Sequence, residues 1–318
     1  MMNEVDLKLI NMDTVVITET KWLWYPYIPY GKITIIQGNP GEGKTTFILA
    51  VVSEITKGGE LPIAKKLETA NVIYQTAEDG LGDTIKPRLI ATGADCTKVI
   101  VIDESEKELT LTDKRIEQAI VETRAKLLII DPLQAFLGSR VDMYRANEIR
   151  PIFKGLGSVA ERTGCAIVLI GHMNKNSGGK SLHRGLGSID ITAAARSVLV
   201  IGRINDDPNI RIMAQVKNNL APEGCSIAFE LDEETGFQWL GEYDINVDHL
   251  LANDISTDKV VKRAERLIEE LLADGPLPSA IIYERAKEEN ISKNTIKKAK
   301  KLLKVQSIKT KKEWLWKL

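Results

Sequence analysis

The sequence predicts an α/β protein in which a mostly parallel sheet is extended by antiparallel strands and followed by a small C-terminal domain. Short apolar runs alternate with helical periodicities between residues 32 and 203, which is the pattern of parallel strands joined by crossover helices. Strand signals without intervening helices follow residue 196. A separate group of short amphipathic helices begins at residue 259.

Five strands and the helices between them make up the expected parallel sheet. Their residues are β-branched or apolar on both faces, as in sheets that helices cover on each side. The strands are expected at residues 32–37, 71–75, 99–102, 127–130 and 166–170. The connecting helices are expected at residues 45–56, 83–91, 113–124 and 146–163. Four further strands would extend the sheet antiparallel at one edge, at residues 197–201, 210–216, 225–231 and 237–240.

The C-terminal residues form a unit with a different pattern. A helix with apolar residues on one face is followed by shorter helices at residues 280–289 and 293–303, and by a basic hairpin at residues 308–316. Three small helices and a terminal hairpin are the outline of a winged helix-turn-helix. We therefore expect a first domain, a linker and a winged-helix domain, at residues 1–242, 243–257 and 258–318.

The overall charge is close to zero, but it is unevenly distributed. The 318 residues include 43 Lys+Arg and 44 Asp+Glu, and 43% are hydrophobic, which excludes wholesale disorder and a uniformly basic coat protein. Residues 256–318 hold 16 basic and 9 acidic residues, a net charge of +7, so the remainder carries 27 minus 35, or −8. The neutrality is a cancellation between an acidic core and a basic tail.

Targeting and redox signals indicate a cytoplasmic protein. Cys96, Cys165 and Cys225 are scattered without CxxC spacing, which favours a reducing compartment over a disulfide framework. The first residues are polar and lack the apolar core of a signal peptide. No apolar run approaches the roughly 18 residues that a membrane span needs, so we expect no membrane segment.

Residues 38–45 match the pattern G-x-x-x-x-G-K-[ST] between a predicted strand and a predicted helix. Glycines in such a loop let backbone N–H groups wrap a phosphate, and the helix N-terminus adds partial positive charge. Lys44 would reach the β- and γ-phosphates of ATP, and the Thr45 hydroxyl would hold Mg²⁺. A chance match in a turn is the alternative. The predicted nucleotide-binding residues are Gly38, Asn39, Pro40, Gly41, Glu42, Gly43, Lys44, Thr45 and Thr46.

Polar residues that follow three other predicted strands complete a hydrolytic site. Asp131 ends the apolar strand 127–130 in the Walker B pattern and would order Mg²⁺. Glu78 follows the second strand and would act as the general base that polarises water, because sites in parallel sheets open at the carboxyl ends of strands. His172 ends the fifth strand and would sense the γ-phosphate or the water. The alternatives are a loop residue for Glu78 and a structural histidine for His172.

Four segments in this order resemble the RepA-like branch of RecA-fold ATPases: residues 38–45, 77–80, 129–133 and 171–175. That branch includes the hexameric replicative helicases of plasmids and helicase-like proteins of phages and other mobile elements. The resemblance covers residues 15–242 and implies a RecA-like fold, ATP and Mg²⁺ as cofactors, and a water-activating glutamate after the second strand. It also implies a homo-hexamer or another ring, with ATP between subunits and a basic residue reaching in from the neighbour.

Two residues are candidates for that contact with the neighbouring nucleotide. Arg196 precedes the first strand of the antiparallel extension, where a salt bridge at the sheet edge is the alternative. Lys217 opens residues 217–224, which resemble the Lys-Asn-Arg finger of DnaB-type helicases. Asn219 stands where that arginine would be, so the resemblance transfers only Lys217.

A glycine-rich basic segment directly after His172 is a candidate for single-stranded DNA. Residues 173–188 contain Lys175, Lys180 and Arg184 and no acidic residue. In RecA-like ATPases the corresponding loop lines the central channel, and a basic, glycine-rich loop suits phosphate contacts. A flexible solvated loop is the alternative.

The third C-terminal helix and the hairpin are candidates for duplex or forked DNA. Residues 291–318 contain ten lysines and one acid, on the expected recognition helix and wing. Lysines indicate contacts to phosphates more than base readout, and a solvated face is the alternative. The predicted contact residues on this helix are Lys293, Asn294, Lys297, Lys298 and Lys301.

Taken together, these patterns predict an ATP-hydrolysing, ring-forming DNA helicase or translocase of a mobile element, acting in plasmid or phage replication. One alternative is a RecA- or RadA-like recombination or repair ATPase, which would form filaments. The other is a DNA-binding regulator or scaffold in which ATP only switches conformation.

Overall fold

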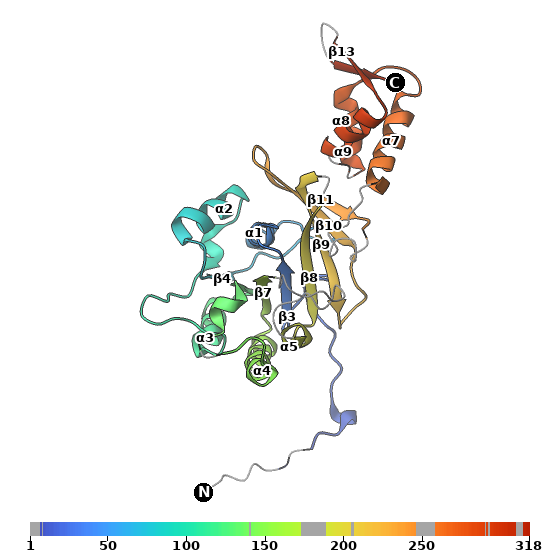
Figure 1. Cartoon of the computed structure of the whole chain (residues 1–318). Helices are drawn as coiled ribbons and strands as arrows, with labels where there is room; N and C mark the ends of the chain where they lie inside the picture. Colours follow the sequence, from blue (N-terminus) through green and yellow to red (C-terminus); the bar gives the residue numbers. More distant parts are fainter. Residues whose placement is uncertain are drawn as a thin grey trace.

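The computed structural model describes residues 7, 9–139, 141–172, 189–204, 207–245, 258–289, 291, 293–309 and 314–318. Within these ranges the chain forms a nine-stranded sheet in the order β11-β10-β9-β8-β3-β7-β6-β4-β5 (Figure 1). The expected mixed α/β fold with a large, mostly parallel sheet is confirmed.

The central part of this sheet is parallel. Hydrogen bonding joins β8 to β3, β3 to β7, β7 to β6, β6 to β4 and β4 to β5 in parallel. These strands are β3 (Ile33–Gly38), β4 (Val72–Thr76), β5 (Val99–Ile100), β6 (Leu127–Asp131), β7 (Ala166–His172) and β8 (Ser197–Ile204). Antiparallel strands then extend the sheet beyond β8, namely β9 (Asp207–Asn218), β10 (Ser226–Asp232) and β11 (Gly236–Tyr243).

The direction of β8 differs from the expectation. The sequence predicts antiparallel strands from residue 197 onward, whereas β8 runs parallel to β3, with Thr34 opposite Ser197. A short helix that the sequence analysis missed, α5 (Ile189–Ala194), precedes β8 and supplies the crossover from β7. A parallel neighbour requires such a crossover, so the antiparallel extension begins one strand later, at β9.

Helices cover both faces of the parallel part. The main helices are α1 (Lys44–Lys57), α2 (Lys86–Ala91), α3 (Lys114–Thr123) and α4 (Ala146–Thr163). Short turns of helix lie at η1 (Met12–Thr14), η2 (Leu81–Ile85), η3 (Cys96–Lys98) and η4 (Leu133–Phe136). The π-helical turn η2 occupies the start of the predicted helix 83–91, and α2 itself begins beside Pro87, whose missing N–H suits a first turn.

Successive strand residues face opposite layers of helices. Ile129 packs into the cluster with α1 residues such as Ile48, whereas Ile130 packs into the cluster with α4 residues such as Phe153. All of these side chains are essentially buried. Burial of each one contributes roughly 1.5–3 kcal/mol, which explains why the strands are apolar on both faces. The two layers hold the strand ends, and therefore the polar residues at those ends, in place.

The C-terminal residues have a hydrophobic cluster of their own, which includes Ile268, Ile296 and Trp316. The elements are α7 (Asp258–Leu272), β12 (Leu277–Pro278), α8 (Ser279–Glu288), α9 (Lys293–Leu302), β13 (Gln306–Lys309) and β14 (Trp314–Lys317). The strands form an antiparallel sheet in the order β12-β14-β13. The two-residue strand β12 is too short for a sequence signal. The bounds 1–242, 243–257 and 258–318 stay a prediction, because residues 246–257 lie outside the described ranges.

The N-terminal segment leads away from the sheet (Figure 1). A small hairpin of β1 (Trp22–Trp24) and β2 (Ile28–Pro29) packs on the core, with Trp24 and Tyr27 buried. Between residues 9 and 17, five apolar side chains are each at least three-quarters exposed: Leu9, Ile10, Met12, Val16 and Ile17. We call residues 9–17 the N-terminal arm. In the described part of the chain, no helix has the length and apolarity that a membrane crossing requires.

Replacement of Ile129 tests the role of the central strands. Ile129→Ala removes a fully buried side chain from β6, and we expect it to lower the free energy of unfolding by about 2–5 kcal/mol. Val121→Ala is the matched control, since Val121 on α3 is 63% exposed and its truncation should change stability by less than about 0.5 kcal/mol. Urea denaturation followed by circular dichroism measures both, and equal losses would contradict the packing described.

Candidate nucleotide site

The carboxyl ends of four parallel strands meet at one edge of the sheet. Strand register places Thr76 of β4 opposite Asp131 of β6, and Gly38 of β3 opposite His172 of β7. The loop after β3, Asp131, His172 and the bend that contains Glu78 therefore lie at the same edge, as the sequence analysis expects. Sites in parallel sheets form at this edge, because the loops that leave the strands surround a common crevice.

The loop between β3 and α1 has the backbone shape that a phosphate requires. Gly41 and Gly43 have φ angles of 79° and 84°, in the left-handed region that favours glycine. A Cβ atom added to Gly43 would lie 2.6 Å from Cδ1 of Leu231, and one added to Gly38 would lie 2.4 Å from the carbonyl oxygen of Ile201. The N-cap of α1 is Gly43, which has no side chain to accept from the first amides, so those donors suit an anion.

Lys44 is folded onto this loop. Its ammonium donates to the carbonyl oxygens of Gly38 at 3.0 Å and Asn39 at 2.8 Å, and the residue is buried. Burial lowers the pKa of Lys44, while the negative charges of Asp131, Glu42 and Glu78 act against that shift. The Lys44 ammonium therefore lies beside the loop, where it can bind a phosphate oxygen.

Asp131 is the buried acid at the end of β6. Its Oδ2 accepts hydrogen bonds from the Thr45 hydroxyl and the Tyr74 hydroxyl, both at 2.8 Å. Burial raises the pKa of Asp131, and the two hydrogen bonds act in the opposite direction. Burial also raises the pKa of Tyr74, helped by Asp131, so Tyr74 is a neutral donor. Sequence reasoning missed Tyr74. A strand tyrosine that donates to a buried acid has the same local sequence pattern as a tyrosine that only packs in the core.

These residues fit a bound Mg²⁺ ion. Magnesium prefers oxygen ligands and is usually bound through one or two protein oxygens together with substrate phosphates. Thr45 Oγ1 and Asp131 Oδ2 lie together beside the loop, and no group of three His, Cys, Asp or Glu side chains among the described residues offers another cation site. ATP with Mg²⁺ therefore matches the donor set at this edge.

Glu78 and His172 face each other across the strand ends. The Oε2 atom of Glu78 lies 3.8 Å from Nε2 of His172, and the Glu78 side chain is 62% exposed. Nδ1 of His172 is buried without a hydrogen-bond partner among the described residues. The neighbouring Asp79 is engaged elsewhere, in an ion pair with Arg88 at 3.1 Å. Of the two adjacent acids, Glu78 is the one without an ion pair to arginine and close to His172, which is compatible with the expected role of a base for water.

Two arginines that sequence reasoning missed lie near the loop, and one of them, Arg203, donates a hydrogen bond to it. Nη2 of Arg203 donates to the carbonyl oxygen of Gly41 at 3.0 Å, and its Nε lies 3.7 Å from Glu42 Oε2. Arg211 is the register partner of Arg203 and is buried, and burial followed by the charge of Arg203 lowers its pKa. Both lie on the β8–β9 pair, more than 150 residues beyond the loop in the sequence, so no local pattern connects them to it.

Arg196 and Lys217 lie at the opposite end of the parallel strands, where β3 begins. Arg196 directly precedes Ser197, which pairs with Thr34 near the start of β3, and Lys217 pairs with Val198. Thr34 and Gly38 are separated by four residues of strand, or about 13 Å at 3.3 Å per residue. Neither basic residue is placed at the phosphate loop of its own chain, so any contact with a nucleotide would be with that of a neighbour.

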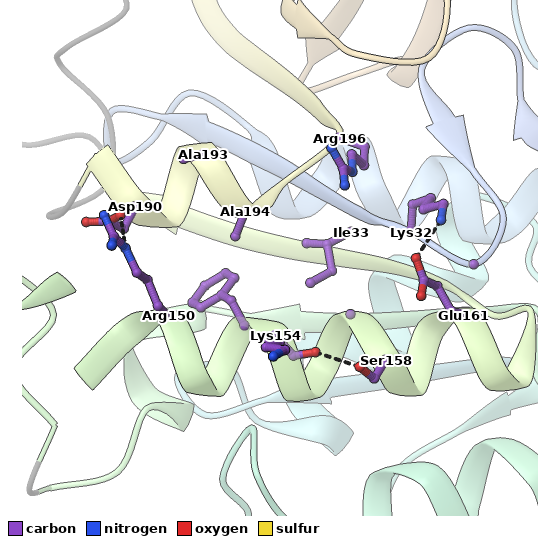
Figure 2. A pocket seen from close by; sticks show the side chains of 13 residues that line it. Lys32, Ile33, Arg150, Lys154, Ser158, Glu161, Asp190, Ala193, Ala194 and Arg196 are labelled. Atoms are coloured by element: carbon purple, nitrogen blue, oxygen red, sulfur yellow. Dashed lines mark hydrogen bonds and ion pairs between the residues drawn. The ribbon is translucent and has the colours of Figure 1, made fainter. Parts of the chain in front are cut away.

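The two candidates differ in their surroundings. The ammonium of Lys217 donates to the carbonyl oxygens of Thr192, Ala193 and Ala195, at 2.9, 3.2 and 2.9 Å, and so caps the C-terminal end of α5. Arg196 is exposed and lines a pocket between α4, α5 and the start of β3. Figure 2 shows it with the ion pairs Lys32–Glu161, at 2.7 Å, and Arg150–Asp190, at 2.6 Å. The trans role of either residue stays a prediction, and Arg196 has the freer side chain.

The structure describes only part of the predicted DNA surface. Lys175, Lys180 and Arg184 lie outside the described residues, as do the side chains of Lys293, Asn294 and Lys298. Lys297 and Lys301 are exposed on α9. Their contact with DNA stays a prediction.

A strand that ends in a glycine loop, with Lys44 and Thr45 beside a buried strand-end aspartate, defines a P-loop ATPase. The family comparison agrees with this class: the model of the AAA domain family matches residues 4–178, and the chain belongs to that family.

Segments of the chain are similar to two curated proteins. One is the DNA repair protein RadA of Mycobacterium tuberculosis, 23% identical over 149 residues, which are 46% of this chain and 28% of RadA. The other is Protein RecA of Picosynechococcus, 25% identical over 159 residues, which are 47% of this chain and 41% of RecA. The alignments span less than half the length of either relative.

Among solved structures, the ATPase domain of G40P has the same fold. It superposes with a TM-score of 0.50 at 13% identity, over 67% of this chain and 85% of that domain. The expected RecA-like fold of the core is thereby confirmed.

Replacement of Asp131 separates stability from nucleotide binding. Because the folded-state pKa of Asp131 lies above 3.8, its ionised carboxyl destabilises the nucleotide-free fold at every pH above that pKa. This penalty disappears as the pH falls toward 3.8. Asp131→Asn keeps an acceptor for Tyr74 without the charge, so we expect a higher melting temperature at neutral pH and no gain near pH 4.

The same variant should lose the stabilisation that ATP with Mg²⁺ gives the wild type, because an amide oxygen is a weak magnesium ligand. Thermal denaturation with and without the nucleotide measures both effects. A lower melting temperature in the nucleotide-free protein would contradict the view that burial of the charge is costly here.

Proposed function

We propose that the protein is an ATP-hydrolysing, ring-forming DNA helicase or translocase of a mobile element, acting in plasmid or phage replication. The observation that carries the proposal is the meeting of Lys44, the Thr45–Asp131 pair and the Glu78–His172 pair at one edge of a RecA-like sheet. Their order along the chain is the order in RepA-like ATPases. The similarity to RadA, which is named for DNA repair, and to RecA supports a role on DNA.

In this proposal the residues of the edge divide the work of hydrolysis. The amides at the start of α1 and the Lys44 ammonium bind the phosphates, while Thr45 and Asp131 hold Mg²⁺. A magnesium ion held there would supply positive charge to the phosphate oxygens. Glu78 accepts a proton from the attacking water, and His172, 3.8 Å away, orients Glu78 or contacts the γ-phosphate.

The proposed contacts with DNA come from two basic segments. The loop with Lys175, Lys180 and Arg184 would contact a single strand in the central channel. The C-terminal unit, with helices α7 to α9 and its three-stranded sheet, would be a winged helix-turn-helix that contacts duplex or forked DNA through α9. The exposed lysines Lys297 and Lys301 on α9 support this role. All three cysteines are free, which fits a reducing cytoplasm.

A ring explains features that a single subunit leaves without a role. Arg196 lies at the edge opposite the phosphate loop, where it would face the nucleotide of a neighbouring subunit. The N-terminal arm exposes apolar side chains, and exposed apolar surface of this kind is typical of contacts between chains. We therefore propose that the arm takes part in self-association.

A Glu78→Gln variant tests the assignment of the base. It should bind ATP with wild-type affinity and hydrolyse it at least about 100-fold more slowly, because the amide cannot accept the proton. Lys44→Ala, as a comparison, should lose both binding and hydrolysis. Wild-type turnover in Glu78→Gln would remove Glu78 from the mechanism. Malachite-green phosphate release measures the rates, and a fluorescent ATP analogue measures binding.

Charges in the arm test its role in assembly. The double substitution Val16→Asp and Ile17→Asp should shift the protein toward the monomer, because two carboxylates cannot be buried at an apolar contact. Light scattering with a non-hydrolysable ATP analogue gives the mass. Thr18→Asp and Thr20→Asp, at exposed polar positions of the same segment, provide the control. An unchanged oligomer in the double variant would exclude the arm from the contact.

The similarity to RadA and RecA also favours a second function, a recombination or repair ATPase. Electron microscopy with single-stranded DNA distinguishes the two, since closed rings support the helicase and long filaments support the recombinase. The third possibility, an ATP-switched DNA-binding regulator or scaffold, predicts slow hydrolysis that DNA does not stimulate and no strand separation.

A further inference from the structure

The C-terminal sheet contains two tryptophans that lie in different environments. Trp316 is 3% exposed and belongs to the hydrophobic cluster of the C-terminal unit. Its ring lies edge-on to Tyr283, with the ring centres 5.4 Å apart, and the Lys300 ammonium lies 4.2 Å from its centre. Trp314, two residues earlier on the same strand, is 51% exposed. One tryptophan therefore holds the fold together, whereas the other leaves half of its surface in solvent.

Strand register explains the difference. The short strand β12 pairs with β14 only at Trp316 and Leu315, so it ends before Trp314. The partner of Trp314 on the other side is Lys309, the last residue of β13. Trp314 thus lies at the open end of the sheet, beyond the part that packs on the helices. The stability of the unit does not require an indole at this position, because its hydrophobic cluster is complete without it.

The surroundings of Trp314 are cationic. The Lys309 ammonium lies 5.6 Å from the centre of the Trp314 ring, within the range of a cation–π contact. Three more exposed lysines lie at the end of α9 and on β14: Lys301, Lys304 and Lys317. From residue 291 onward the sequence contains ten lysines and a single acidic residue, Glu313. A ligand of this surface must therefore carry negative charge and present a flat ring.

Nucleic acid with an unpaired base meets both requirements. An acidic peptide could pair with the lysines but would leave the indole face uncovered, and an apolar protein surface would bury the lysines without a counter-ion. A continuous duplex offers phosphates, but its bases are stacked on one another and closed to an indole. Base–aromatic stacking contributes about 1–3 kcal/mol per base when the base is free.

We propose that Trp314 stacks on an unpaired nucleobase while Lys309 and the neighbouring lysines bind phosphates, so that the C-terminal unit binds single-stranded or frayed DNA. This inference rests on the proposed function, because it takes the C-terminal unit as a DNA-binding domain. The proposed function assigns DNA contacts to α9. The inference adds a contact between the C-terminal hairpin and an unpaired base.

Photocrosslinking of the full chain tests the contact directly. The probe is oligothymidine in which one thymine is replaced by 5-iodouracil, which links to a stacked aromatic side chain on irradiation. We expect the adduct in the peptide that contains Trp314, with a yield at least about tenfold lower in Trp314→Ala, the loss that removal of one stacked base implies. Trp314→Phe keeps a ring that can stack and should retain most of the adduct.

Two controls define the outcome. Ile308→Ala truncates a partly exposed side chain on the opposite face of the same hairpin and should leave the adduct unchanged. The same iodouracil base inside a closed duplex should give little adduct. An equal yield from paired and unpaired bases would overturn the assignment to an unpaired base. Binding of the probe with adducts only elsewhere in the chain would overturn the role of Trp314, and it would leave the proposed function intact.

Salt titration adds a second readout. Trp314→Ala should weaken binding of oligothymidine without changing the slope of log affinity against log salt concentration, because the indole carries no charge. Lys309→Ala should reduce that slope, since it removes a phosphate contact. A full chain that binds no DNA at all would refute both the proposal and the DNA-binding role on which it rests. A changed slope in Trp314→Ala would indicate a rearranged hairpin and would overturn the stacking assignment.

Discussion

The buried carboxylate of Asp131 is the interaction on which the arrangement of the site depends. It joins three elements, because it ends β6, accepts from Tyr74 on β4 and accepts from Thr45 on the first turn of α1. A charge at this depth is costly, and these donors, together with a cation when one is bound, offset that cost. The phosphate loop is therefore held against the sheet through a residue whose own chemistry is that of a magnesium ligand.

The two ends of the parallel strands have different roles. At the carboxyl ends of the strands, Gly43 of the loop after β3 lies close to Leu231 of β10, and Arg203 of β8 donates to the carbonyl oxygen of Gly41, so strands from late in the chain contact a motif from its beginning. At the amino ends of the strands, Arg196 lines a pocket with residues of α4 and α5 (Figure 2). It is separated from that loop by about the length of a strand. A rigid sheet keeps these groups apart within one subunit. This separation is the physical reason why the proposed mechanism needs a second copy of the chain.

The charge distribution divides the proposed functions between the two units. Residues 1–255 are acidic overall, so binding of DNA by this part would depend on a local basic loop. The C-terminal unit, in contrast, carries an excess of lysine. In the proposal, the lysines of that unit would attract DNA phosphates without distinguishing paired from unpaired bases. Selectivity for unpaired DNA would come from one exposed ring, Trp314, whose position is set by the end of the neighbouring strand β12.

The fold class and the phosphate-binding part of the site could be predicted from local sequence patterns. Apolar runs marked the buried strands because both faces are covered, and the loop at residues 38–45 and Asp131 are recognisable because their chemistry depends on contiguous residues. Other features depend on contacts between distant segments. The parallel direction of β8 depends on pairing with a strand more than 150 residues earlier in the sequence. Tyr74 and Arg203 reach the site only through strand pairing, which also places Arg211 opposite Arg203, and the Lys217 ammonium binds carbonyl oxygens at the end of α5. Contacts between distant segments follow from how strands pair, and no local pattern encodes that pairing.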